Sequence, residues 1–239
     1  MKRSRPHRDV RFRSAWGRTA APLDPFLAPA LASAPPPSPH PVTLSVPLVL
    51  ASRSPRRRRL LEQLGLAFTV QGSPAEERVP EAAAFDEAAR AMAQQKVRPV
   101  AEARPDALVL AADTVVGHDG AILEKPTDAD DARRMLRSLS GSRHRVCTGV
   151  ALAHAADGRE VVFSETTRVR FADLSDDEID AYVATGEPLD KAGGYGIQHG
   201  LGSVFVEGLD GDYFTVVGLP LHRLYRRLRA DFADVLSLS

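Results

Sequence analysis

The sequence predicts an α/β fold built on a mixed twisted sheet, with helices flanking it. Short apolar runs alternate with amphipathic or alanine-rich stretches along most of the chain, which is typical of strands joined by helical crossovers. Two glycine-containing turns, Asp119-Gly120 and Asp157-Gly158, instead join neighbouring β-rich runs and indicate antiparallel hairpins. A sheet that contains both kinds of connection holds both parallel and antiparallel strands.

Short-range signals place the individual elements. Strands are expected at 46–51, 66–71, 108–116, 144–154 and 159–171. Helices are expected from residue 55 and at 82–103, 128–139, 175–185 and 219–236, with a glycine-rich segment at 192–202. Ser54 is the expected cap of the first helix, with Pro55 at a position where a missing N–H costs nothing. We expect Thr127 to cap the helix at 128–139, and Ser175 to open a capping box.

The composition argues against several classes of function. Among the 239 residues, 31 basic side chains balance 31 acidic ones, so no global field attracts nucleic acid or a membrane surface. No apolar run approaches the length of a bilayer span. Cys147 is the single cysteine, which excludes an intrachain disulfide and a cysteine-rich metal cluster. We therefore expect a cytoplasmic protein with neither a membrane nor a nucleic acid as its partner.

Residues 1–45 differ in composition from the rest of the chain. The first forty residues hold seven Lys and Arg but only two acidic residues, and they end in an Ala/Pro-rich stretch that cannot bury a core. We expect a disordered extension at 1–45 and a folded domain at 46–239. Three interpretations of the extension stay open: a dispensable or transit-like segment, a basic tail that touches nucleic acid, and a start codon assigned too early.

The turn between the first strand and the first helix is the first candidate site. Four consecutive arginines, 56–59, lie on the first turns of this helix, although basic side chains are a poor match for the positive end of a helix dipole. An anion at the same place would resolve the mismatch. Backbone N–H groups, the hydroxyls of Ser52 and Ser54 and one or two arginines would then form a phosphate cradle. A plain surface helix in an arginine-rich protein is the alternative.

Asp113 is the second candidate, because it interrupts the strongly apolar strand expected at 108–116. A carboxylate inside such a strand is costly unless it has a partner. Binding a metal or activating water explains it better than a purely structural ion pair does.

Several other residues are weak candidates when each is taken alone. Glu76 and Glu77 could add oxygen ligands for a hard cation such as Mg²⁺, or they are simply two acids in a loop. Lys96 and Lys125 could bind an anion, or they are solvated amines. Gln198, in the glycine-rich segment, offers an amide donor and an amide acceptor that match the O4 and N3–H edge of uracil or thymine. A loop glutamine with no ligand is the alternative there.

Six motifs, taken together and in order, closely resemble the Maf family of nucleoside triphosphate pyrophosphatases, in its dTTP/UTP branch. They are Ala-Ser-Arg-Ser-Pro-Arg-Arg at 51–57, Ala-Asp-Thr-Val-Val at 112–116, Glu-Lys-Pro at 124–126, Leu-Ser-Gly-Ser-Arg-His at 139–144, Glu-Pro-Leu-Asp-Lys-Ala-Gly-Gly-Tyr-Gly-Ile-Gln at 187–198 and Val-Gly-Leu-Pro at 217–220. The resemblance runs from about residue 46 to the end of the chain. It implies a two-lobed Maf/ITPase-like fold with a central cleft, a homodimer, and a divalent cation, Mg²⁺ or Mn²⁺.

The resemblance also implies roles for individual residues. Asp113 matches the catalytic acid/base, and it would share a metal site with Glu76 or Glu77. The positions that match phosphate-binding residues are Ser52, Arg56, Arg57, Lys96 and Lys125. The positions that match base-selecting residues are Arg56, Thr114 and Gln198.

The function expected from these residues is hydrolysis of nucleoside triphosphates, chiefly dTTP and UTP or modified pyrimidine nucleotides, to monophosphate and pyrophosphate. The alternative is a regulator of cell division that binds nucleotide or nucleic acid without turning it over. Such a binder would have no need for a carboxylate in an apolar strand, so Asp113 favours the enzyme.

Overall fold

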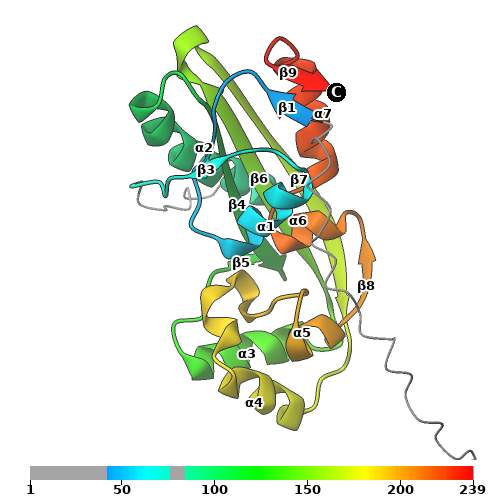
Figure 1. Ribbon diagram of the computed structural model, residues 1–239. Coiled ribbons are helices and arrows are strands. Elements are labelled where there is room, and N and C mark those ends of the chain that lie inside the picture. Colours follow the sequence, from blue (N-terminus) through cyan, green and yellow to red (C-terminus); the bar gives the residue numbers. More distant parts are fainter. Residues whose placement is uncertain (1–41, 76–83, 239) are drawn as a thin grey trace, which may run out of the picture. The chain divides into compact units, whose positions relative to one another are not determined.

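A mixed sheet forms the centre of the structure, a computed structural model that describes residues 42–75 and 84–238 (Figure 1). All of these residues belong to one unit, 39–239. Its strands are β2 (Leu48–Leu50), β3 (Thr69–Val70), β4 (Leu108–His118), β5 (Ala121–Leu123), β6 (Arg143–His154), β7 (Arg159–Phe171) and β8 (Val206–Asp210). They are adjacent in the order β3-β2-β4-β6-β7-β8, and β5 pairs with β4. Since β2 is parallel to β3 and β4 while the other pairs are antiparallel, the expected α/β class with a mixed sheet is confirmed.

Helices cover both faces of the sheet. They are α1 (Pro55–Gln63), α2 (Phe85–Ala103), α3 (Ala129–Leu139), α4 (Asp176–Ala184), α5 (Gly200–Val204), α6 (Tyr213–Val217) and α7 (Leu221–Asp231). Side chains alternate along β4, as in any strand. Leu108 and Leu110 pack in one core with α1 and α7, whereas Val109 and Ala111 pack in another core with α2. The same alternation places Asp113 on the α2 face of β4 and Thr114 on the opposite face.

The long strands β4, β6 and β7 pass through two hydrophobic cores. One end of these strands packs with α1 and α7, and the other end packs with α3 and α4 (Figure 1). In β6, for example, Val150 belongs to the first core and Val146 to the second. The two lobes implied by the family resemblance are therefore two cores along one set of strands.

Several boundaries differ from the expected ones. Residues 42–44, expected in the extension, form β1 (Val42–Leu44), which pairs with β9 (Leu236–Leu238) beyond the end of α7. The last helix therefore ends at Asp231 and not at residue 236. Pairs of three-residue strands carry too little periodicity to be read from sequence, which explains both errors. Residue 45 is also described, and its backbone N–H donates to the Val235 carbonyl at 2.8 Å. Residues 1–41 of the expected extension lie outside the described residues, as do the first two residues of the helix expected at 82–103.

The caps are mostly as expected. Ser54 caps α1, and Ser175 forms the capping box of α4. The cap of α3 is Asp128, whose carboxylate accepts from the backbone N–H of Asp131 at 2.8 Å, so the expectation of Thr127 was wrong by one residue. None of the helices in the described parts is long and apolar enough to span a bilayer.

Candidate active site

A pocket of about 830 Å³ opens at the edge of β4, in a gap between β2 and β5. β2 pairs with β4 only as far as the Leu50–Leu110 pair, and β5 pairs with it from Val116 onwards. Between these points Asp113, Thr114 and Val115 have β6 on one side and line the pocket. The volume falls within the range of about 300–1,000 Å³ that is usual for small-ligand sites.

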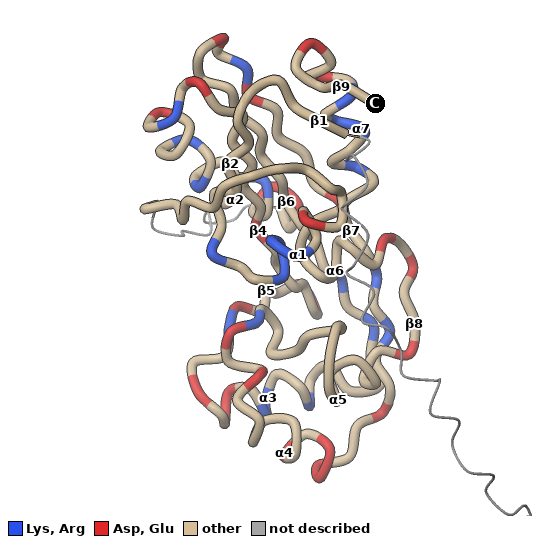
Figure 2. The backbone as a smooth tube through the Cα atoms, viewed as in Figure 1, with Lys and Arg blue, Asp and Glu red and all other residues tan. Residues whose placement is uncertain are grey.

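The turn from β2 into α1 forms one wall of this pocket. The Ser52 hydroxyl accepts from the backbone N–H of Ser54 at 3.2 Å, and the Ser54 hydroxyl accepts from the backbone N–H of Arg57 at 3.4 Å. These two bonds fix the turn and direct the first turn of α1 at the pocket. The arginines there form a run of basic residues beside the sheet (Figure 2). The wall therefore combines a helix N-terminus with cationic side chains, which suits an anion.

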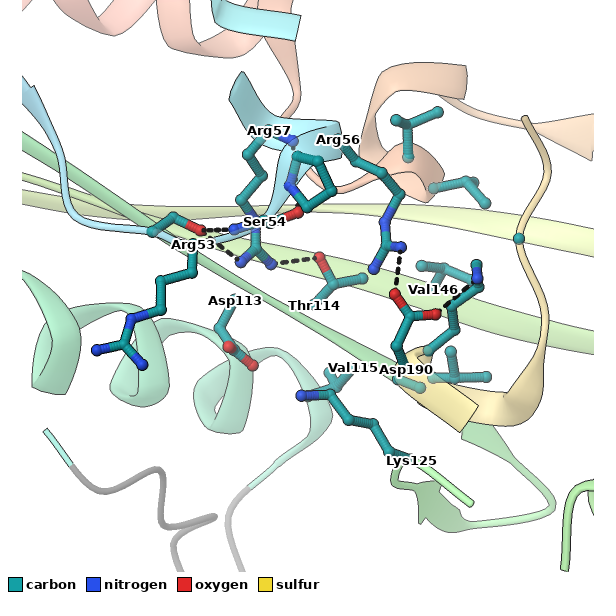
Figure 3. Close-up of a pocket in the computed structure, with 18 of the residues that line it drawn as sticks. Arg53, Ser54, Arg56, Arg57, Asp113, Thr114, Val115, Lys125, Val146 and Asp190 are labelled. Atoms are coloured by element: carbon teal, nitrogen blue, oxygen red, sulfur yellow. Dashed lines mark hydrogen bonds and ion pairs between the residues drawn. The ribbon is translucent and has the colours of Figure 1, made fainter. Parts of the chain in front are cut away.

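Arg57 is held by the protein from three sides. Its Nε donates to the Gly218 carbonyl at 2.9 Å. Its Nη2 donates to Thr114 Oγ1 at 3.1 Å, and Nη1 donates to Ser52 Oγ at 3.4 Å (Figure 3). A guanidinium in such a fork is preorganised, so it can present positive charge to a ligand without first losing side-chain freedom.

Arg56 is held differently, through a carboxylate that the sequence did not single out. Its Nη1 donates to Asp190 Oδ2 at 3.2 Å, and the Lys191 amine contacts the other oxygen of Asp190 at 2.6 Å (Figure 3). Burial alone would raise the pKa of Asp190, but the hydrogen bonds and charges of Lys191 and Arg56 outweigh it, so the pKa lies below its usual value. The adjacent Asp190 and Lys191 stood out in the sequence only as a charge pair in the glycine-rich motif.

Asp113 and Lys96 form a buried ion pair beside the pocket. Their exposed fractions are 6% and 8%, and the Lys96 amine contacts Asp113 Oδ1. Lys96 could have been found in the sequence as this partner, because it lies on the same stripe of α2 as the buried residues Ala89, Met92, Ala93 and Val100. A lysine on a buried stripe needs a counter-ion, and Asp113 is the carboxylate on the strand that this stripe covers.

The pocket brings together every candidate that the structure describes. Its lining includes Ser52, Arg56, Arg57, Lys96, Asp113, Thr114, Lys125 and Gln198. These residues come from five separate stretches of the chain, and Lys125 extends into the pocket from the end of β5 (Figure 3). Glu76 and Glu77 lie outside the described residues. Within the described ranges, no three His, Cys, Asp or Glu side chains are grouped as a metal site.

Comparison with known proteins agrees with this arrangement. Residues 47–231 match the family model described as Maf-like protein. The chain belongs to this family. It is 58% identical to the dTTP/UTP pyrophosphatase of Salinibacter ruber over 196 residues, which cover 82% of this chain and 96% of that protein. It is 51% identical over 183 residues to the dTTP/UTP pyrophosphatase of Halalkalibacterium halodurans (77% of this chain, 95% of the other). It is 47% identical over 188 residues to that of Bacillus cereus strain AH820 (79% and 97%). The resemblance expected from the six motifs is confirmed.

In this Maf-like chain a buried aromatic cluster of His144, Phe171 and Tyr195 holds the glycine-rich motif in place. Tyr195, three residues before Gln198, is buried and hydrogen-bonds through its hydroxyl to His144 Nε2 at 2.7 Å. Both rings pack edge-on against Phe171. Burial raises the pKa of Tyr195, so its hydroxyl stays protonated. Burial, with a smaller contribution from His118, lowers the pKa of His144 from 6.5 to about 4.

The His144–Tyr195 anchor should make the Maf-like fold less stable in mild acid. His144 is neutral in the folded chain down to about pH 4, whereas the unfolded chain binds a proton at its ordinary pKa of 6.5. The unfolded state therefore binds more protons between these values, and stability falls as the pH drops through this window. We expect His144 to contribute a loss of about 2 kcal/mol between pH 7 and pH 5, measured by urea unfolding.

Two variants isolate this effect. His144→Gln keeps a polar partner for Tyr195 but cannot titrate, so its loss of stability between pH 7 and pH 5 should be smaller than that of the wild type by about 2 kcal/mol. His222→Gln, at an exposed position on α7, should behave like the wild type. An identical pH dependence in the His144→Gln variant would contradict the role given to this histidine.

Proposed function

We propose that this chain hydrolyses dTTP and UTP to nucleoside monophosphate and pyrophosphate. The observation that carries the proposal is the meeting of a buried carboxylate, Asp113, with a wall of cationic side chains in one pocket. The curated relatives are named for this reaction, and the aligned segments span nearly their whole length.

The triphosphate lies along the turn that begins α1. Backbone N–H groups and the Ser52 hydroxyl face it there, and Arg56, Arg57 and Lys125 neutralise its charge. Arg57 is already fixed by its bonds to Gly218 and Thr114, so binding costs little further ordering of this side chain. The α-phosphorus lies next to Asp113.

The reaction is an attack of water on the α-phosphorus with pyrophosphate as the leaving group. Asp113 accepts the proton of the attacking water, and the bond between the α-phosphorus and the bridging oxygen breaks. Lys96, which the family resemblance assigned to the phosphates, holds the Asp113 carboxylate in place in this proposal. The basic wall stabilises the negative charge that develops on pyrophosphate. Water supplies the oxygen gained by the monophosphate, so atoms and charge balance.

A divalent cation is compatible with the residues that the structure describes. Mg²⁺ is usually held by one or two carboxylates together with substrate phosphates and water, rather than by a full protein cage. Asp113 would hold it here, joined by Glu76 or Glu77 from outside the described residues. When bound, the cation would neutralise phosphate charge.

The reaction is tested by measuring pyrophosphate release from a panel of nucleoside triphosphates with Mg²⁺ or Mn²⁺. We expect strong preference for dTTP and UTP, because Gln198 can match the O4 and N3–H edge of their bases. Preference for purines or 7-methyl-GTP would keep the reaction and refute the role given to Gln198. Folded protein that hydrolyses none of them would support the binding regulator.

The extension gives a second way to separate the two functions. Among the residues that the structure describes, those that line the pocket all follow position 50. Removal of residues 1–41, which keeps β1, should therefore leave the rate of pyrophosphate release within about twofold of that of the full chain. For comparison, a loss of about 1.4 kcal/mol of transition-state stabilisation would lower the rate about tenfold. A large loss of hydrolysis, or a loss of nucleic-acid binding by the shortened chain, would favour a functional role for this basic segment.

A further inference from the structure

Gln198 by itself cannot distinguish uracil or thymine from cytosine. The relevant edge of uracil is a carbonyl, an N3–H donor and a second carbonyl, whereas cytosine has an unprotonated N3 and an amino group at position 4. A glutamine amide carries one donor and one acceptor, and turning it over exchanges them. It can therefore match either base. A group of fixed polarity is needed to tell the two pyrimidines apart.

Thr114 is such a group because of what surrounds its hydroxyl. Thr114 and Thr148 are direct cross-strand partners in β4 and β6, and their hydroxyl oxygens lie 2.9 Å apart. Arg57 Nη2 donates to Thr114 Oγ1 at 3.1 Å, from the opposite end of this pair. Thr148 Oγ1 lies 2.7 Å from the backbone carbonyl of Thr215. The contacts form a chain from a guanidinium through two hydroxyls to a carbonyl.

The two ends of this chain fix the position of both hydroxyl protons. A guanidinium can only donate, and a carbonyl can only accept. Thr148 must therefore donate its proton to Thr215, which leaves the Thr148 oxygen to accept the proton of Thr114. Thr114 thus donates its only hydroxyl proton to Thr148. Its oxygen has two lone pairs, of which Arg57 uses one, so towards a ligand Thr114 can act only as an acceptor.

The carbonyl at the end of the chain is itself held in place. Asp212 caps α6, and its Oδ2 accepts from both the backbone N–H and the hydroxyl of Thr215 at 2.7 Å. Thr148 and Thr215 are both fully buried, so water cannot compete for these bonds. The polarity of Thr114 is thus determined by the fold and does not adjust to the ligand.

We propose that Thr148 is a positioning residue that makes Thr114 an obligate acceptor and thereby selects pyrimidine triphosphates that carry an N3–H. The proposal rests on the hydrolysis proposed above. In it, the Thr114 oxygen takes the place of the Gln198 carbonyl as the acceptor of N3–H of uracil or thymine, and the Gln198 amide donates to a neighbouring carbonyl. Cytosine would place its N3 lone pair against the Thr114 lone pair, which is repulsive. Through its bond to Thr114 Oγ1, Arg57 connects the phosphate-binding wall of the pocket to the residue that contacts the base.

Thr148→Val tests this inference. Valine has the same shape but neither donates nor accepts, so the Thr114 proton is released and can turn towards a ligand. We expect kcat/KM for CTP relative to UTP to rise by about tenfold or more, since a donor at Thr114 can serve cytosine N3. The ratio of two substrates on one enzyme cancels any loss of folded protein, which a purely structural role would cause.

Two control variants bracket the result. Thr148→Ser keeps the hydroxyl and should keep the wild-type ratio. Thr167→Val removes a hydroxyl that is equally buried and also bonded to the backbone near α6, through Asp212 at 2.8 and 2.9 Å. Thr167 lies on β7, where its cross-strand partner in β6 is Val146, and it is not a member of the chain of bonds that ends at Thr114. It should lower stability without changing the CTP/UTP ratio.

The outcomes separate this inference from the proposed function. If the wild type hydrolyses UTP and the ratio is the same in Thr148→Val, the inference is overturned while the proposed function stands. If the wild type hydrolyses neither UTP nor CTP, the proposed function fails. Should Thr148→Val not fold, Thr114→Val takes its place: kcat/KM for UTP should then fall by more than that for CTP. Equal losses for both substrates would overturn the inference.

Discussion

Replacing Asp113 by asparagine should lower pyrophosphate release from dTTP by about 10²- to 10⁴-fold, the usual contribution of a positioned general base. Asparagine has the same shape and can still accept a hydrogen bond from Lys96, but it cannot take a proton from water. The change also removes the counter-charge of a buried lysine. Stability should therefore fall as well, by up to about 3–5 kcal/mol.

Because activity and stability both change, the two must be measured on the same preparation. Urea unfolding gives the folded fraction, and pyrophosphate release is then expressed per folded molecule. Asp210→Asn is the matched control, since it breaks an Asp–Arg pair of 3.2 Å on the surface, where Arg168 and Asp210 are largely exposed. An exposed pair contributes about 0–1 kcal/mol, so this variant should keep its activity. Full activity in Asp113→Asn would show that another group activates the water.

Long or strongly signalled features were predictable from the sequence. The apolar run around Asp113 is β4, and the Asp157-Gly158 turn joins β6 to β7 as expected. Most of the described residues that meet in the pocket also belonged to motifs whose chemistry suited a nucleotide, whereas Lys96 lies in none of the six motifs. These signals are local, so they do not depend on how distant segments meet.

Features that depend on distant contacts could not be predicted. β1 and β9 are stable only as a pair, although nearly two hundred residues separate them in the chain. The short helix α6 was not expected from the sequence. Because α6 positions the Thr215 carbonyl, the contact of that carbonyl with Thr148 could not be predicted either. Thr148 itself reads as an ordinary strand threonine. Its effect on Thr114 can be recognised only in the folded structure, where Arg57 of α1 supplies a donor at the other end of the same chain of bonds.

Gly149 shows how one such distant contact supports the Lys96–Asp113 pair. It lies directly opposite Asp113 in the β4–β6 register, on the face covered by α2. A Cβ atom built at this position would overlap the backbone carbonyl of Ala89 and would lie 2.6 Å from the backbone nitrogen of Arg90. Backbone atoms inside a helix cannot turn aside as a side chain can. Glycine therefore lets α2 approach the sheet closely enough for Lys96 to reach Asp113.

Gly149→Ala should accordingly damage both stability and turnover. The added methyl must push α2 away from β6, and overpacking of this kind costs about 1–3 kcal/mol, which urea unfolding would measure. The same displacement moves Lys96, two turns further along α2, relative to Asp113. A shift of about 1 Å in a catalytic group can cost on the order of 10²-fold in rate, so we expect kcat to fall well beyond the loss of folded protein.

Gly208→Ala provides the comparison, because it makes the same chemical change in a strand of the same sheet. The nearest atom to its added Cβ would be a guanidinium nitrogen of Arg170, at 3.2 Å, which belongs to a flexible and half-exposed side chain. That side chain can move aside, so stability and kcat should stay close to those of the wild type. If Gly149→Ala left stability and kcat equally unchanged, α2 and β6 would be far enough apart to accommodate the added methyl group. The Lys96–Asp113 pair would then owe its geometry to the α2 contacts with β7, such as the bond of 2.9 Å from Arg90 to Ser164, and not to the missing side chain of Gly149.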